Sequence, residues 1–334
     1  YATFPALAFK WRVLEESWAQ NSLGKLFSEF NVRANYGKLG SQDNLGAYAA
    51  LNLQQTYNPG TGSSTRFIQQ GNPDLKWEEV TTTGIGVDFT SLNRRLSITA
   101  DYYNNQRRNM LFFAPTPGGF APTSFWWINL DGEVNNKGFE VSANYKFVNA
   151  KKFKWDASLN LTTVKNNISG LPTPINTGEV SGQGLTGAFA QTLTNGYSIF
   201  SWSMPVFNGF DGNGNARYAN GAANQIVGSA LPKLFAGLTN NFSFGNWTVS
   251  AFLNTIRGHY IYNNTANALL LKGSLRNARN VTNAVGNGVE NPFNPGSVST
   301  RFLEKGDFVR LSNLNVNYNF NLKSGAAVKT LNVF

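Results

Sequence analysis

Apolar and polar residues alternate strictly over residues 313–322, near the end of the chain. Successive side chains of a β-strand point to opposite faces of the sheet, so a period of two predicts a strand with two different faces. The apolar face would carry Leu314, Val316, Tyr318, Phe320 and Leu322, and the polar face Asn313, Asn315, Asn317, Asn319 and Asn321.

The same alternation recurs in pairs of segments that predict antiparallel hairpins. We expect strands of roughly 9–11 residues, which is the length that crosses a bilayer at a tilt. The paired segments are 85–89 with 96–102, 139–147 with 153–161, and 234–244 with 247–253.

Short and long connections alternate between these strands. The short turns lie near 91–95, 149–152 and 245–246, and the long polar connections at about 104–136, 164–232 and 257–306. Compact soluble domains rarely need loops of this length, whereas outer-membrane barrels have short periplasmic turns and long extracellular loops. The pattern favours a transmembrane barrel; a secreted β-sandwich that binds glycans has the same periodicity and is an alternative.

Aromatic residues near the strand ends also favour a barrel, because aromatic girdles mark the two membrane interfaces. They are Tyr102, Tyr103, Phe147, Phe153, Trp155 and Trp247.

The composition excludes several classes of protein. Charged residues make up 14% of the 334 residues and aromatic residues another 14%, which is unlike a disordered chain. No run approaches the ~18 apolar residues of a spanning helix. Cysteine is absent, which excludes disulfides. The net charge of +10 is scattered and accompanied by no recognition motif, so we expect no nucleic-acid partner.

Seven short segments, in order along nearly the whole chain, resemble sequence words of the SusC/RagA-type TonB-linked outer-membrane proteins of Bacteroidetes. The most specific is Asn72–Glu78 (NPDLKWE), which resembles the family's "NP-x-L-x-WE". The others are Trp11–Glu16, Phe30–Gln42, Asp101–Asn104, Val134–Glu140, Gly228–Lys233 and Phe302–Leu314.

The resemblance implies an all-β fold: an antiparallel transmembrane β-barrel of the TonB-dependent transporter type, of which about ten strands are covered. Residues 1–334 would form a C-terminal portion of the barrel. We expect the plug, the N-terminal extension and the last strands to lie outside this chain, and because Tyr1 opens directly into an aromatic segment we expect no signal peptide.

The resemblance also implies a function and partners. The protein would import a glycan, oligosaccharide or peptide-like nutrient across the bacterial outer membrane, with a SusD-like surface lipoprotein and with TonB acting through regions absent here. Its apolar faces would contact outer-membrane lipid, and the asparagines 313–321 would face the lumen. A passive porin, or a structural barrel in an envelope complex, is the alternative.

A candidate metal site lies at Asp211, Asn213 and Asn215, whose side-chain oxygens occupy alternate positions as in calcium loops. The sixth and twelfth positions of an EF-hand would be Ala216 and Ala222, where that loop needs glycine and glutamate. A structural Ca²⁺ and a simple Gly/Asn turn are both open, and the turn is favoured.

A candidate substrate site is the aromatic cluster Phe125, Trp126 and Trp127, placed in a long loop. Aromatic faces stack on sugar rings, but loop packing, membrane anchoring and docking of a partner lipoprotein are ordinary alternatives. No catalytic constellation is apparent, since the only histidine, His259, has no nucleophile elbow near it. We therefore expect a protein that is not an enzyme and has no cofactor.

Overall fold

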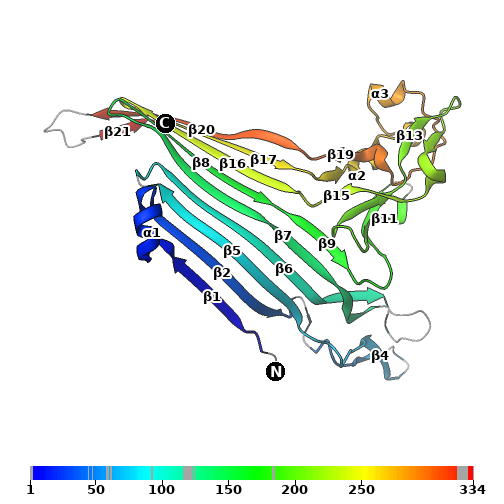
Figure 1. Cartoon of the computed structure of the whole chain (residues 1–334). Helices are drawn as coiled ribbons and strands as arrows, with labels where there is room; N and C mark the ends of the chain where they lie inside the picture. The colour runs from blue at the N-terminus through cyan, green and yellow to red at the C-terminus, as the bar shows by residue number, and fades with distance from the viewer. Residues whose placement is uncertain are drawn as a thin grey trace.

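The computed structural model describes residues 3–333, except 44, 47, 58–59, 61, 92, 116–122, 124, 183–184 and 322–329. Within these residues one large antiparallel sheet contains ten strands in sequential order, and β9 (Lys165–Ser169) pairs with β7 beside them (Figure 1). The ten strands are β1 (Ala6–Arg12), β2 (Phe27–Ser41), β5 (Glu78–Ser91), β6 (Leu96–Pro115), β7 (Phe125–Asn149), β8 (Phe153–Thr163), β16 (Leu234–Phe244), β17 (Trp247–Arg257), β20 (Phe308–Asn321) and β21 (Thr330–Val333).

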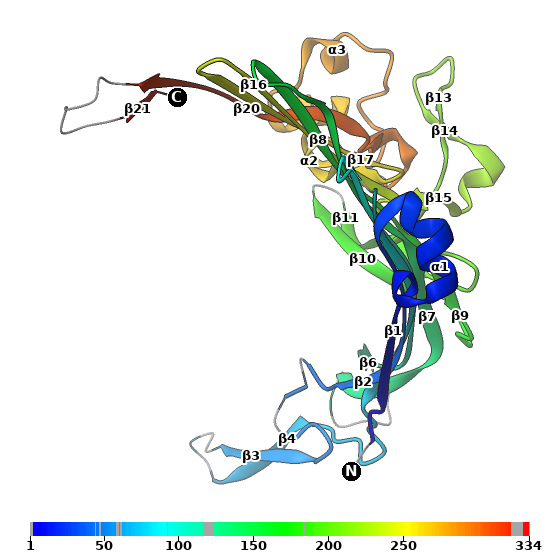
Figure 2. The same ribbon diagram turned by 60° about the vertical axis from the view of Figure 1, so that its left-hand side comes forward.

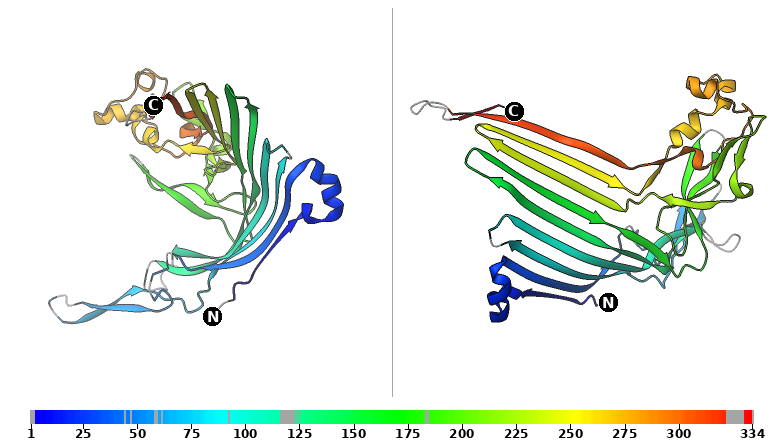
Figure 3. Two further views of the ribbon diagram at one scale, coloured as in Figure 1. Left: turned by 90° about the vertical axis from the view of Figure 1, so that its left-hand side faces the viewer. Right: turned by 45° about the horizontal axis from the view of Figure 1, so that its top comes forward.

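The sheet curves like part of a cylinder wall, with β10 (Ile175–Gly182) and β11 (Leu185–Leu193) on its concave side (Figures 2 and 3). A sandwich would need a second sheet packed against the apolar face of the first. The apolar face is instead exposed, so the sandwich alternative is wrong, and the prediction of a partial antiparallel barrel of about ten strands is confirmed.

The outer face of the sheet, defined here as the face that carries Leu314, is apolar across eight strands. Among its exposed residues, Leu311 and Leu314 are 53% and 59% accessible. One continuous row of cross-strand neighbours runs Phe30, Phe89, Ile98, Ala143, Leu159, Leu238, Leu253 and Leu311. Such a band can be stable only against an apolar medium, which is the arrangement of a barrel in lipid.

The inner face, which carries Asn313, is polar over the same strands. Its neighbouring row runs Asn31, Asp88, Thr99, Ser142, Asn160, Gly237, Asn254 and Arg310. Side chains on this face bind one another across the strands: the Ser142 hydroxyl donates to Asn160 Oδ1 at 2.7 Å, and Asn241 Nδ2 donates to Asp156 Oδ2 at 2.9 Å.

A β-bulge in β20 keeps its apolar residues on one face. Leu311 pairs with Leu253 and Leu314 pairs with Ala251, so Ser312 is the extra residue. Asn313, Asn315, Asn317 and Asn319 lie on the inner face, and Asn317 Nδ2 donates to Asn315 Oδ1 at 2.7 Å. The side chain of Asn321, and Leu322, lie outside the described residues.

Aromatic side chains cluster where the apolar band ends. At the end with the short turns, ring centroids of Phe147 and Trp155 are 4.1 Å apart, and those of Trp155 and Phe242 are 5.6 Å apart. At the other end, Tyr102 and Phe139 are 5.2 Å apart. The expectation for Tyr103 is wrong: it points to the inner face, where its hydroxyl donates to the carbonyl oxygen of Thr163 at 3.2 Å.

The connection expected at about 104–136 is mostly strand. β6 is 20 residues long and β7 is 25, well beyond the expected 9–11, and residues 116–124 join them. Above Tyr102 both faces of this hairpin are rich in polar residues, so apolar alternation stops although strand pairing continues. The strands therefore continue past the apolar band into water. There the sequence no longer has the apolar alternation that predicts a strand.

The segments 164–232 and 257–306 lie together at the end of the sheet opposite α1 (Ser17–Ser22), as Figure 1 shows. They contain small sheets rather than plain loops. The strands of these small sheets are β10, β11, β12 (Ser201–Met204), β13 (Phe207–Phe210), β14 (Ala216–Tyr218), β15 (Gln225–Ser229), β18 (Tyr260–Tyr262) and β19 (Leu303–Lys305). A separate hairpin is formed by β3 (Leu53–Tyr57) and β4 (Ser64–Gln69).

Buried apolar clusters occur at this end of the protein. One contains Leu130, Val134, Ile168 and Leu171, with Ile175 and Leu193 packed against it, so β10 and β11 cover the inner face of β7 and β9. A second contains Ala190, Trp202 and Met204. The described helices, including α2 (Asn264–Leu269) and α3 (Asn283–Gly286), are all too short or too polar to cross a membrane.

We predict that Leu314→Arg in the full-length protein lowers the free energy of unfolding by about 2–4 kcal/mol, because it places a charge in the lipid-facing band. The measurement is equilibrium unfolding of the protein in lipid vesicles. Asn313→Arg is the matched control on the inner face and is expected to have little effect. Equal losses from both variants would contradict the assignment of the faces.

Candidate functional site

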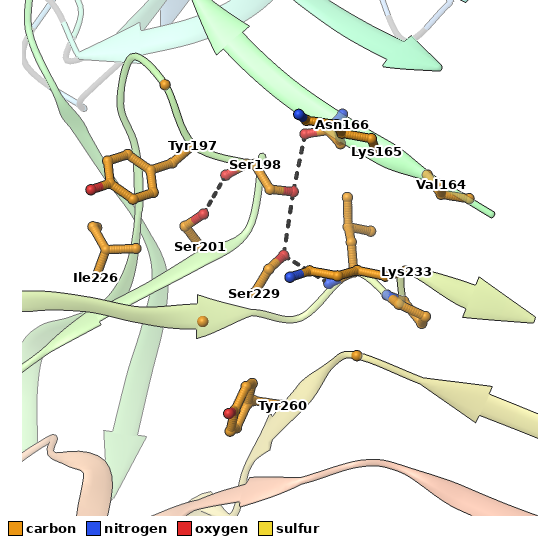
Figure 4. A pocket seen from close by; sticks show the side chains of 15 residues that line it. Val164, Lys165, Asn166, Tyr197, Ser198, Ser201, Ile226, Ser229, Lys233 and Tyr260 are labelled. Atoms are coloured by element: carbon orange, nitrogen blue, oxygen red, sulfur yellow. Dashed lines mark hydrogen bonds between the residues drawn. The ribbon is translucent and has the colours of Figure 1, made fainter. Parts of the chain in front are cut away.

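A cleft of about 490 Å³ lies where the large sheet meets the small sheet of β10, β11, β12 and β15 (Figure 4). Four segments form its wall. They are residues 164–166 at the start of β9, the turn 196–201 that leads into β12, the end of β15, and Tyr260 of β18. Segments more than 90 residues apart along the chain therefore meet in it.

The cleft exists because two neighbouring strands separate. β8 pairs with β16 up to the Thr163–Leu234 pair, and the last contact is the Val164 N–H donating to the Lys233 carbonyl at 2.9 Å. β9 then stays with β7, and the turn 196–201 fills the space beside it. Asn166 Oδ1 holds that turn by accepting from the Ser198 hydroxyl at 3.1 Å and from Ile199 N–H at 2.7 Å.

Gly228 allows Tyr260 to lie against the wall of the cleft. Its φ of +141° lies in a region that L side chains rarely adopt, and a Cβ on it would come within 2.6 Å of the Tyr260 ring. Tyr260 in turn accepts through its carbonyl oxygen from Trp202 Nε1 at 3.0 Å, which joins the cleft to the buried cluster around Trp202.

The chemistry of the cleft suits binding. Two exposed ammonium groups, Lys165 and Lys233, line it together with the rings of Tyr197 and Tyr260. The Ser198 hydroxyl donates to the Asn166 amide and accepts from the Ser229 hydroxyl, the Ser201 hydroxyl bonds to the backbone, and none of the three meets a histidine or a carboxylate. This arrangement offers cations, hydroxyls and aromatic faces to a polar solute and activates no nucleophile.

Burial alters one titratable group behind the cleft. Tyr262 packs beside Trp202 with 6.0 Å between ring centroids, and burial raises the pKa of Tyr262 to about 12. Its hydroxyl therefore stays neutral at pH 7.

The three residues of the candidate metal site form a hydrogen-bonded turn between β13 and β14. The Asp211 carboxylate accepts from the N–H groups of Asn213 and Asn215 at 2.9 and 2.8 Å, and these bonds, with that of Asn215 first, lower the pKa of Asp211. Asn291 Nδ2 donates to Asn215 Oδ1 at 3.2 Å and docks the turn. The turn accounts for all three residues, and the described part of the chain contains no cluster of three or more His, Cys, Asp and Glu suited to a metal.

The aromatic candidates lie on a strand instead of a loop. Phe125, Trp126 and Trp127 begin β7 opposite residues 113–115 of β6. Trp127 is half-buried with its ring centroid 5.2 Å from that of Phe113, and Trp126 is half-buried too. The side chain of Phe125 lies outside the described residues. None of the three lines the cleft, so the structure does not bring the sequence candidates together into one site.

The segment Asn72–Glu78 has a structural role beside the start of β7. Asn72 Nδ2 donates to the carbonyl of Trp127 at 3.0 Å, and Asn129 exchanges two hydrogen bonds with the backbone of Lys76 at 2.7 and 2.9 Å. Glu78 forms an ion pair with Arg107 at 2.7 Å. The segment therefore ties the chain before β5 to the start of β7.

Sequence reasoning missed the cleft as a site. Its lining residues are separated along the chain and have no chemical signature in common. The one available signal was the segment Gly228–Lys233, which carries part of the family resemblance and contributes Gly228, Ser229 and Lys233 to the wall.

A family model described as "TonB dependent receptor-like, beta-barrel" matches residues 1–334. The chain belongs to this family. The match confirms the predicted resemblance and a barrel receptor that is not an enzyme.

Curated relatives agree with the family. The TonB-dependent receptor SusC of Bacteroides thetaiotaomicron is 27% identical over 348 residues, which are 96% of this chain and 34% of SusC. The TonB-dependent receptor P3 of Formosa agariphila is 25% identical over 364 residues, 96% of this chain and 35% of P3. The chain thus spans about a third of the length of these relatives.

The solved structure of the RagAB peptide transporter has the same fold. It superposes with a TM-score of 0.80 at 21% identity, over 97% of this chain and 38% of the other. At this identity the likeness establishes the fold alone.

We predict that Gly228→Ala narrows the cleft and destabilises the small sheets around it by about 1–3 kcal/mol, because the new methyl group overlaps the Tyr260 ring. The measurement is thermal unfolding of the full-length receptor in detergent. Gly209→Ala is the control, since Gly209 also has a positive φ, +79°, but no atom within 4 Å of an added Cβ. A Gly228 variant no less stable than the control would refute the close packing.

Proposed function

We propose that this chain is part of the barrel of an outer-membrane importer that takes up a glycan, oligosaccharide or peptide with a SusD-like lipoprotein. The observation that carries the proposal is the two-faced sheet: an exposed apolar outer face and a hydrogen-bonded polar inner face, in a chain of the TonB-dependent receptor-like family. An inner face of this kind suits a water-filled lumen or contact with a plug.

The charged cluster on the inner face supports a hydrated lumen. Arg33 binds Asp88 through Nε and an amino group at 2.8 and 3.1 Å, and it also contacts Asp101 at 2.9 Å. Gly86 leaves room for it, since a Cβ there would overlap Asp101 and Arg33. Charges in this position favour water or a polar plug surface over lipid.

The substrate class is inferred from the polar character of the inner face and the cleft. Amides, hydroxyls and aromatic rings match sugars and peptides equally, so the proposal includes both. Contact of Trp126 and Trp127 with a sugar remains part of the proposal, as does lumen-facing placement of Asn313, Asn315, Asn317, Asn319 and Asn321. The structurally similar RagAB is a peptide transporter, which makes peptides a substrate worth testing.

Two exposed apolar side chains in the segment between α2 and β19 support a protein partner. Val289 is 76% exposed and Phe293 is 70% exposed, with Arg276 4.0 Å above the Phe293 ring. Exposed apolar residues rimmed by charge are typical of interaction sites. They lie at the end of the protein remote from the short turns, where a surface lipoprotein would dock.

The import proposal is tested by deleting the full-length gene in its native host and measuring growth on defined glycans and peptides. We expect the deletion strain to lose growth on one substrate. The intact gene should restore that growth, and a gene that lacks the TonB box, the segment through which TonB acts, should not. Rescue by the form without the TonB box would favour a passive porin.

The partner proposal predicts that Val289→Asp with Phe293→Asp abolishes co-purification of a lipoprotein with the full-length receptor. The cause would be two carboxylates that must lose water at the interface. The measurement is mass spectrometry of proteins retained in detergent. Phe67→Asp with Ile68→Asp in β4 is the matched control, and loss of the partner in both double variants would argue against this surface.

A further inference from the structure

A polar cavity of about 450 Å³ lies on the outer face of the sheet, directly beyond the apolar band. On β6 the outer face carries Leu96, Ile98, Ala100 and Tyr102, and then changes to Asn104 and Gln106. On β7 it changes from Phe139 to Lys137. The contact between Tyr102 and Phe139 therefore marks the border between the band and the cavity.

Seven residues line the cavity, and six of them, all but Tyr102, form a regular patch in two rows across β6, β7 and β9. We call it the outer polar patch. Its rows are Asn104, Lys137 and Lys165, and Gln106, Asn135 and Asn167. All six side chains are polar, although they occupy the face that is apolar a few residues below.

The patch has an uncompensated positive charge. Lys137 and Lys165 lie directly opposite one another on neighbouring strands. Two like charges in such a pair repel one another and destabilise the sheet. Both are exposed, and neither belongs to an ion pair in the described part of the chain. Glu133, further along the same face of β7, is engaged by Arg108 at 2.7 Å.

The amides beside the lysines can still donate hydrogen bonds. Asn104 Oδ1 accepts from Asn135 Nδ2 at 2.9 Å, which leaves the amino group of Asn104 without a partner among the described residues. Gln106 has no side-chain partner there either. The patch thus presents two cations and free amide donors, the groups that bind a phosphate and the hydroxyls around it.

We propose that the outer polar patch binds the phosphorylated sugar head group of an outer-leaflet glycolipid. The inference rests on the proposed outer-membrane location, which puts the apolar band in the hydrocarbon and the patch at the level of the head groups. Lipid is favoured over a soluble phosphate because the band directly below the patch provides a surface for acyl chains attached to the same molecule. The lysines bind the phosphate, and the amides bind the sugar.

The test measures binding of a bisphosphorylated lipid A to the delipidated full-length receptor in detergent by native mass spectrometry. We expect Lys137→Gln with Lys165→Gln to weaken binding about 30-fold, since each cation near a membrane surface contributes about 1 kcal/mol. Lys151→Gln with Lys152→Gln removes the same charge at the opposite end of β7 and is expected to leave binding unchanged. Lys137→Arg with Lys165→Arg is expected to retain it.

The same lipid without its phosphates is expected to bind as weakly as the double variant, and inorganic phosphate at equal concentration is expected not to compete. Equal binding by both double glutamine variants would overturn the proposal. Full competition by inorganic phosphate would instead indicate a site for a soluble anion and would overturn the lipid assignment.

Uptake by a single variant separates this inference from the proposed function. Lys137→Gln leaves the cleft residue Lys165 in place, so it is expected to leave the affinity for imported substrate unchanged while lipid binding falls. A receptor that binds the glycolipid through the patch and imports nothing would refute the import proposal and leave the patch intact. Loss of substrate affinity with unchanged lipid binding would overturn the glycolipid proposal.

Discussion

The structure depends on one constraint: backbone polar groups that face lipid must find their hydrogen-bond partners within the protein. Ten strands in sequential antiparallel order satisfy it between neighbours, and short hairpin turns keep the register simple. Side chains are then divided by the pleat between lipid and water. The bulge at Ser312 shows how closely this is maintained, because one extra residue is accommodated while Leu311 and Leu314 remain on the outer face.

The environment of a single strand changes from lipid to water along its length, and the face that carries the apolar packing changes with it. Within the band, apolar residues face outward and no apolar cluster is buried between layers of the described residues. Beyond Tyr102 the inner face becomes the packed one, where Val134 and Ile168 are covered by Ile175 and Leu193. This end of the protein is thus an ordinary folded region with a core, built directly on the extended strands of a membrane sheet.

The short segments that carry the family resemblance are explained by packing. Asn72 and Asn129 join the segment before β5 to the start of β7, and Gly228 makes room for Tyr260. Arg33 binds two aspartates beside a glycine that leaves space for them. These residues position the scaffold on which a site can be built.

The sequence by itself determined the strand faces, because a period of two is a local property that survives without tertiary information. It therefore predicted the apolar face that carries Leu314 and the asparagines opposite it. The barrel class was predicted by the alternation of short and long connections, the aromatic residues near the strand ends and the family resemblance. It could not determine the extent of β6 and β7, since beyond Tyr102 the outer face becomes polar while apolar residues such as Val134 lie on the packed inner face, and the outward-facing apolar alternation ends. Only the tertiary structure brought Lys165, Gly228 and Tyr260 to one cleft and placed Lys137 opposite Lys165, because register and strand divergence are set by pairing between distant segments.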